Sequence, residues 1–122
     1  MSNIAWNSFV TKHKNPLGFA AVVSATLPKG PHFDKNKKKL PTPYTLFKEW
    51  CDKTLKDDWS SQKFKGGFIV CVSSQNDAKL IQSAFKVLNA QPKSTPACAK
   101  TYQIGYSDSG YEALAQSLGY AI

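Results

Sequence analysis

A short segment of the chain combines positive charge with aromatic character. Residues 29–43, KGPHFDKNKKKLPTP, hold five lysines, one histidine and one phenylalanine. Lysine ammonium groups bind phosphate oxygens as point charges, and an aromatic ring beside them can stack on an unpaired base. We therefore expect a basic loop over residues 28–43 that contacts nucleic acid. Its candidate binding residues are Lys29, His32, Phe33, Lys35, Lys37, Lys38 and Lys39.

The same loop also fits a solvated connector, because lysine clusters often only keep a surface soluble. Its length exceeds the four to six residues that are typical of connections, and long loops are often functional. The whole chain carries 16 basic and 8 acidic residues, and every basic residue is a lysine. Arginine is the usual reader of guanine edges. Its absence predicts contact with the phosphate backbone and little sequence preference, although an AT-rich genome would also explain it.

A second candidate site lies in two segments rich in hydroxyl side chains, VSSQND and YSDSGYE. Each follows an expected strand and opens an expected helix. If the two strands are parallel, both helix N-termini lie at one edge of the sheet, where free N–H groups favour an anion. The anion-site residues would be Ser73, Ser74, Asn76, Ser107 and Ser109. Helix capping uses the same residue types and is the alternative.

Residues for catalysis are sparse. His13 and His32 are the only histidines, and no nucleophile motif accompanies either of them. A metal-independent ribonuclease that uses His32 with the lysines is a third functional hypothesis. Asp57 and Asp58 are adjacent carboxylates beside a helix end, which are usually solvated. We expect a non-enzymatic protein without cofactor or metal.

Length and composition predict one domain spanning residues 1–122. The apolar runs are too short for a membrane helix, and the N-terminal residues lack the pattern of a secretion signal. Three widely spaced cysteines do not form a disulfide framework, so a cytoplasmic location is the expectation. Cys51 and Cys71 are expected in the core, and Cys98 is the cysteine expected to be most accessible.

The chain pattern alternates strands and helices. A short helix is favoured at the start by Trp6, Phe9, Val10 and His13, although a strand is the alternative. Apolar runs at 17–28 and 68–74 predict buried strands, and residues 99–106 alternate as a strand with one polar side. Helices are expected over 42–58, 74–90 and 109–120, and residues 59–66 are expected to form a polar connector.

Several residue patterns predict where the helices begin and end. Thr42 and Pro43 suit an N-cap and the first helical position. The pairs Ser74 with Asp77 and Ser109 with Glu112 predict capping boxes, and Gly119 predicts a glycine C-cap. Three strand-then-helix units imply an α/β domain with a sheet of three or four strands and helices packed on it. A split, ferredoxin-like arrangement and a small doubly wound sheet both remain open.

A protein-binding function is the main alternative to nucleic-acid binding. The chain contains three tryptophans and five tyrosines, which are frequent interface anchors. Trp59, in the expected connector, is the aromatic residue most expected at a surface. The hypothesis is an inhibitor or accessory protein of the antitoxin, immunity or phage and mobile-element type, which binds an acidic or nucleic-acid-handling partner. No membrane partner is expected, and a homodimer is a further option.

Overall fold

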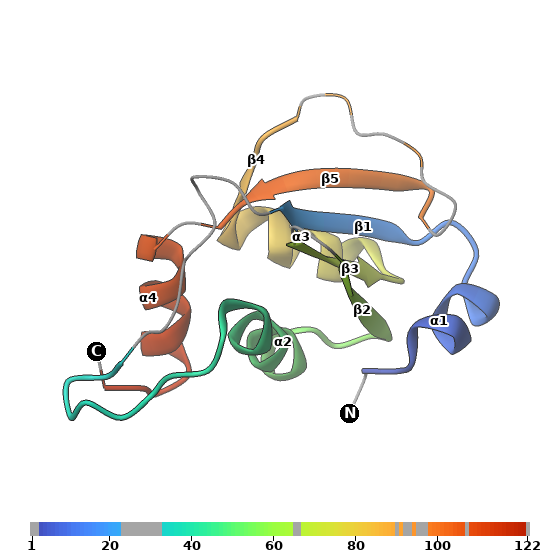
Figure 1. Cartoon of the computed structure of the whole chain (residues 1–122). Coiled ribbons are helices and arrows are strands. Elements are labelled where there is room, and N and C mark those ends of the chain that lie inside the picture. Colours follow the sequence, from blue (N-terminus) through green and yellow to red (C-terminus); the bar gives the residue numbers. More distant parts are fainter. Residues whose placement is uncertain are drawn as a thin grey trace.

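The computed structural model describes residues 3–22, 33–64, 67–89, 91, 94, 98–106 and 108–121. Lys29, His32, Ser107 and residues 23–28 of the expected first strand lie outside the described residues. Within them, four helices and five strands follow one another along the chain (Figure 1). In chain order these are α1 Trp6–Lys12, β1 Leu17–Val22, α2 Pro43–Thr54, β2 Trp59–Phe64, β3 Gly67–Val72, α3 Gln75–Ala84, β4 Lys86–Val87, β5 Lys100–Gly105 and α4 Asp108–Ser117.

The five strands form one mixed sheet in the order β2-β3-β1-β5-β4. Strand β3 is antiparallel to both β1 and β2, so β1 and β2 run in the same direction with β3 between them. Strand β1 is parallel to β5, and β4 is antiparallel to β5. The α/β class is therefore confirmed. Because β3 lies antiparallel between β1 and β2, these two strands and α2 form a split β-α-β unit, and the sheet is not a doubly wound parallel one.

The sheet has more strands than the three or four expected, because two strands lack a recognisable pattern. The prediction of a polar connector is wrong for residues 59–64, which form strand β2. This strand lies at the edge of the sheet, and its last three residues are exposed, so its sequence WSSQKF shows no apolar alternation. Strand β4 has only two residues, which is too short for any periodicity.

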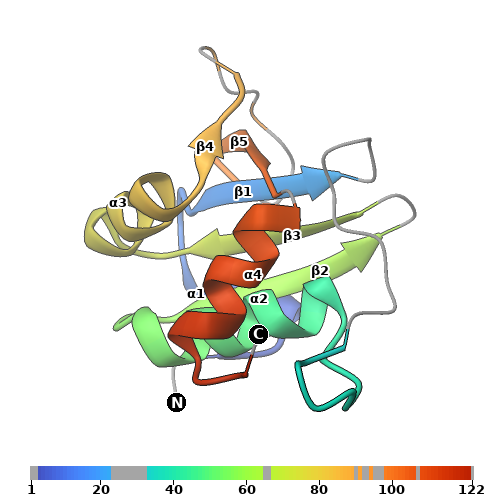
Figure 2. The same cartoon turned by 90° about the vertical axis from the view of Figure 1, so that its left-hand side faces the viewer.

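The two faces of the sheet are covered by different helices. Phe68, Val70 and Val72 of β3 join the main core, which α2, α3 and α4 also line. Ile69 and Cys71 point to the opposite face and pack with Phe9 of α1. Figure 2 shows α2 and α4 in front of the strands and α1 behind them. This alternation explains why the β3 sequence is almost continuously apolar.

An aromatic cluster fills the main core around Phe47 of α2. Its ring centroid lies 4.7 Å from that of Phe85 and 5.1 Å from that of Phe68. The rings of Trp50 and Tyr106 complete the cluster. Trp59 is also fully buried, so the expectation that it is a surface residue is wrong. As the first residue of β2 it faces the core, opposite Val72.

The helix ends follow the local patterns in most cases. The side chain of Thr42 accepts a hydrogen bond from the Thr45 N–H, and Ser74 caps α3 in the same way through the Asp77 N–H. Gly119 has a φ of +91°, and the Tyr120 N–H donates to the Ala115 carbonyl, as in a Schellman C-cap. These predicted caps are confirmed, as is the short N-terminal helix.

Three helix boundaries differ from the prediction. Helix α2 ends at Thr54 and not at residue 58, because Leu55 adopts an extended backbone. Helix α3 ends at Ala84, because Phe85 adopts an extended backbone and the next two residues join the sheet as β4. Leu88, expected on the buried stripe, is 45% exposed. Helix α4 begins at Asp108, so Ser109 lies inside its first turn and is not the N-cap. Among the described residues, no helix has the length and apolar character to span a membrane.

A disulfide joins Cys71 of β3 to Cys98, which precedes β5. Strands β3 and β5 flank β1, and Gly18 of β1 lies between the two cysteines: a Cβ on Gly18 would lie 2.9 Å from the Cys98 Sγ. The expectation of unpaired cysteines is therefore wrong, and Cys98 is buried rather than accessible. The prediction of a cytoplasmic location rests on unpaired cysteines, and the disulfide removes that reason.

Candidate nucleic-acid interface

Residues 33–39 form a hydrogen-bonded turn, which we call the basic turn. Its ends meet in an antiparallel bridge between Phe33 and Lys39. The Asp34 N–H donates to the Lys38 carbonyl at 2.9 Å, and the Asp34 Oδ1 accepts from the N–H groups of Asn36 and Lys38 at 2.8 and 2.9 Å. The segment therefore has a defined, hydrogen-bonded backbone conformation.

The side chains of the basic turn face solvent. Phe33 is 55% exposed, which is unusual for a phenylalanine. Among the described residues, no carboxylate forms an ion pair with the turn lysines, which are all exposed: Lys35, Lys37, Lys38 and Lys39. The Asp34 carboxylate is instead occupied by backbone N–H groups. Four ammonium groups and one aromatic ring are thus available to a ligand on a short stretch of backbone.

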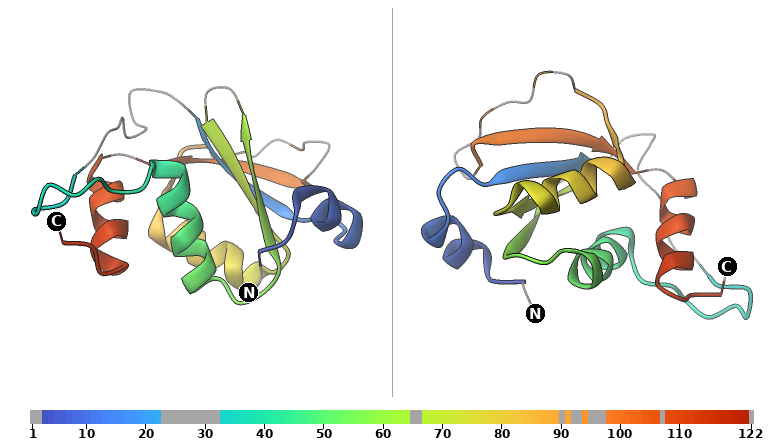
Figure 3. Two further views of the ribbon diagram at one scale, coloured as in Figure 1. Left: turned by 60° about the horizontal axis from the view of Figure 1, so that its bottom comes forward. Right: turned by 180° about the vertical axis from the view of Figure 1, so that it is seen from behind.

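The basic turn is attached to the C-terminal part of the chain. The Lys35 N–H donates to the Ala121 carbonyl at 2.9 Å. The Tyr111 hydroxyl of α4 donates to the Pro41 carbonyl at 2.6 Å, and Leu40 is buried. Burial raises the pKa of Tyr111, which keeps its hydroxyl protonated as a donor. Figure 3 shows the turn projecting beside α4 and the C-terminus, away from the sheet.

The structure thus brings Phe33 and the four lysines of the turn together, and Lys29 and His32 lie outside the described residues. The binding role of all these residues stays a prediction. What the sequence did not indicate is the attachment by Tyr111 and Ala121, because these residues lie 70 residues beyond Pro41 and 86 residues beyond Lys35.

The second candidate site, the shared anion pocket, is not formed. It required parallel strands before α3 and α4, but β3 is antiparallel to β1 while β5 is parallel to it. The N-termini of α3 and α4 therefore lie at opposite ends of the sheet. Ser73 donates to the Asp58 carbonyl, Ser74 caps α3 and Asn76 is exposed. Ser109 belongs to the distant helix α4, so these side chains do not converge.

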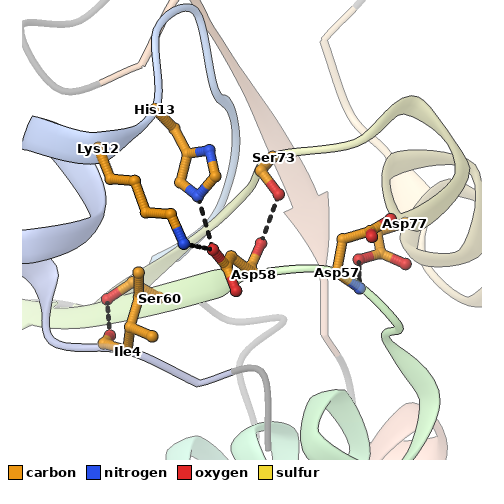
Figure 4. Close-up of polar contacts among 8 residues, drawn as sticks. All are labelled: Ile4, Lys12, His13, Asp57, Asp58, Ser60, Ser73 and Asp77. Atoms are coloured by element: carbon orange, nitrogen blue, oxygen red, sulfur yellow. Dashed lines mark hydrogen bonds and ion pairs between the residues drawn. The ribbon is translucent and has the colours of Figure 1, made fainter.

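A polar cluster that the sequence did not reveal joins α1 to the start of β2 (Figure 4). The Asp58 Oδ2 lies 2.8 Å from both the Lys12 Nζ and the His13 Nε2. These hydrogen bonds from Lys12 and His13 hold the pKa of Asp58 below its usual value. The His13 and Asp58 side chains are 23% and 27% exposed, so solvent screens the interaction. These contacts join the end of α1 to the residue that precedes β2, and they thereby hold α1 against the sheet.

Asp77 forms a second structural contact beside this cluster. Its carboxylate is fully buried and accepts hydrogen bonds from the N–H groups of Lys56 and Asp57, at 3.0 and 2.9 Å. The expected capping box is therefore only half formed: Ser74 caps the helix, while the Asp77 side chain turns to the α2–β2 connection. The connection is thereby held against the N-terminus of α3.

Comparisons with protein-family models, curated proteins and solved structures found no match for this chain. The fold and the exposed basic turn define the protein as a small basic α/β domain. Its functional interpretation rests on the chemistry of that turn.

Proposed function

We propose that the protein binds nucleic acid through the basic turn. Lys35, Lys37, Lys38 and Lys39 contact phosphate oxygens, and Phe33 stacks on an unpaired base. The observation that carries the proposal is the fixed, solvent-facing presentation of an exposed aromatic ring beside four lysines that form no ion pair within the described part of the chain. This pairing of positive charge with an aromatic platform is how single-stranded nucleic acids are bound without sequence readout.

The electrostatics of the turn predict a strong dependence on salt. Each phosphate contact releases condensed counterions, and the logarithm of affinity falls with the logarithm of salt by about 0.7 per contact for single strands. Four contacts would therefore weaken binding by about 50-fold between 50 and 200 mM salt. Lysine carries no bidentate base-reading geometry, so little preference among sequences is expected.

The test is fluorescence anisotropy with labelled single- and double-stranded DNA and RNA at these two salt concentrations. The wild type is compared with the turn variant K35Q/K37Q/K38Q/K39Q. A control variant, K53Q/K79Q/K86Q/K100Q, removes the same charge from exposed lysines elsewhere. We expect tight, salt-dependent binding by the wild type, loss in the turn variant and a smaller reduction in the control.

Two results would contradict the proposal. Equal losses in the turn and control variants would show a response to net charge alone. No binding at the lower salt concentration would exclude a polyanion ligand and favour the inhibitor or accessory hypothesis. Pull-down experiments would then be used to find the protein partner. Cleavage of the labelled RNA would instead support the ribonuclease hypothesis.

A further inference from the structure

We infer that the bound strand continues from the basic turn across a second surface, which we call the α2–β2 flank. It consists of Tyr44 and Lys48 of α2 together with Ser61 and Lys63 of β2. This inference rests on the proposed function and identifies the ligand as a single strand long enough to reach beyond the turn.

The first half of the flank is fixed by contacts of Tyr44. The Tyr44 hydroxyl and the Ser61 Oγ share a hydrogen bond of 3.0 Å, and the Tyr44 ring lies against Phe68 in the core, with 5.1 Å between ring centroids. The Lys48 Nζ lies 4.6 Å from the centre of the Tyr44 ring. A cation–π contact therefore holds this ammonium group at the junction of α2 and β2.

The second half of the flank is Lys63. Side chains alternate along a strand, so Lys63 faces the same side of β2 as Ser61 and lies about 7 Å further along it. Lys63 is exposed, and β2 is an edge strand of the sheet. Among the described residues, no carboxylate pairs with Lys48 or Lys63.

The flank adjoins the basic turn. Only residues 40–42 separate the turn from α2, and Tyr44 belongs to the first turn of that helix. Figure 2 shows the basic turn, the start of α2 and the end of β2 on the same side of the molecule. A flexible strand held at Phe33 thus meets further positive charge at Lys48 and then at Lys63.

Lysine on an edge strand also has another role, since it discourages pairing with a second sheet. A matched pair of variants separates the two roles. The flank variant K48Q/K63Q is compared with K79Q/K86Q, whose lysines are exposed on α3 and on β4, the edge strand opposite β2. Glutamine keeps the aliphatic stem, and thermal unfolding checks that each variant is folded.

Each variant is titrated with single-stranded oligonucleotides of about 4 and about 16 nucleotides. We expect the flank variant to bind the longer strand about tenfold more weakly than the wild type. The slope of the logarithm of affinity against the logarithm of salt concentration should be smaller by about 1.4, because two contacts are lost. Its affinity for the shorter strand should be unchanged, because the turn alone holds that ligand. The K79Q/K86Q pair should change the affinity for the two lengths equally and only slightly.

The possible failures can be told apart. If the turn variant loses binding while the two double variants behave alike, the proposed function holds and the flank is not part of the site. If the flank variant binds both oligonucleotides more weakly by the same factor, the strand does not run from the turn to the flank. If the wild type binds neither length, the proposed function and this inference both fail.

Discussion

The Asp58 carboxylate and the His13 imidazole lie 2.8 Å apart, Oδ2 to Nε2, although 45 residues separate them in the chain. The contact ties the end of α1 to the beginning of β2, and Lys12 reinforces it through the same carboxylate oxygen. A second hydrogen bond, from the Ser60 hydroxyl to the Ile4 carbonyl, links the residues just before α1 to β2. Helix α1 is thus held to the sheet by polar contacts as well as by Phe9.

Replacing Asp58 should change how stability depends on pH. The pKa of Asp58 is lower in the folded state, because Lys12 and His13 stabilise its ionised form. The contact therefore stabilises the fold above the ordinary aspartate pKa of about 4, and this contribution is lost as the pH falls through the lowered value. We expect D58N to unfold at a lower temperature than the wild type at pH 7, and the difference to vanish in acid.

The neighbouring variant D57N is the control, because the exposed Asp57 side chain makes no such contact. Thermal unfolding of D58N and D57N is followed by circular dichroism from about pH 2 to about pH 7, a range that spans the titration of aspartate. A D58N curve parallel to the wild-type curve at every pH would show that the His13 and Lys12 contacts do not stabilise the fold.

Removing the Asp77 carboxylate should destabilise the whole domain. D77A would remove the carboxylate that accepts hydrogen bonds from the N–H groups of Lys56 and Asp57 at a part-buried site, at a cost of about 2–4 kcal/mol in the free energy of unfolding. D52A removes an exposed carboxylate from α2 and should change it by less than about 0.5 kcal/mol. Urea unfolding measures both, and similar values for the two variants would refute a structural role for Asp77.

Breaking the Cys71–Cys98 disulfide should also reduce stability. The two cysteines are 27 residues apart, and closing a loop of this size stabilises a fold by about 3 kcal/mol. Alkylation of the unfolded, unreduced protein should modify Cys51 alone, and all three cysteines should react after reduction. A reductant should lower the unfolding temperature of the wild type but not that of C71A/C98A. Three reactive cysteines before reduction would show that the bond is absent.

Substituting Asp34 should separate the geometry of the basic turn from its charge. D34A and D34N both add one unit of positive charge, but only asparagine keeps an oxygen that can accept the backbone N–H groups of Asn36 and Lys38. We expect D34N to bind single-stranded DNA at least as well as the wild type. D34A should bind several-fold more weakly than D34N, because an open turn must be ordered on binding. Equal affinities would mean that turn geometry is irrelevant.

Substituting Phe33 should affect single strands selectively. Stacking of one base on an aromatic side chain contributes about 1–3 kcal/mol, so F33A should weaken single-strand binding by about 5- to 150-fold. F33Y retains the ring and should bind like the wild type. Duplex DNA, whose bases are already stacked, should bind F33A and the wild type alike. Because Phe33 is exposed, F33A should keep the melting temperature of the wild type, and thermal unfolding of both proteins checks this.

The local features of this protein were predictable from neighbouring residues. Thr42 with Pro43, Ser74, and Gly119 each mark a helix end because the cap is a contact within about three to five residues. Strand β3 was predictable because both of its faces are buried, which makes its sequence uniformly apolar. Strand β2 was not, since an edge strand with an exposed end resembles a connector.

The candidate site also combines features that the sequence predicts with features that depend on contacts between distant parts of the chain. The sequence by itself determined the density of positive charge and the aromatic ring at residues 33–39, because composition needs no partner from elsewhere in the chain. Only the tertiary structure decided strand directions, and these placed the N-termini of α3 and α4 at opposite ends of the sheet. It also decided the pairing of Cys71 with Cys98 and of His13 with Asp58. Such contacts join residues far apart in the chain, and they form only when packing of the whole core fixes which strands are neighbours.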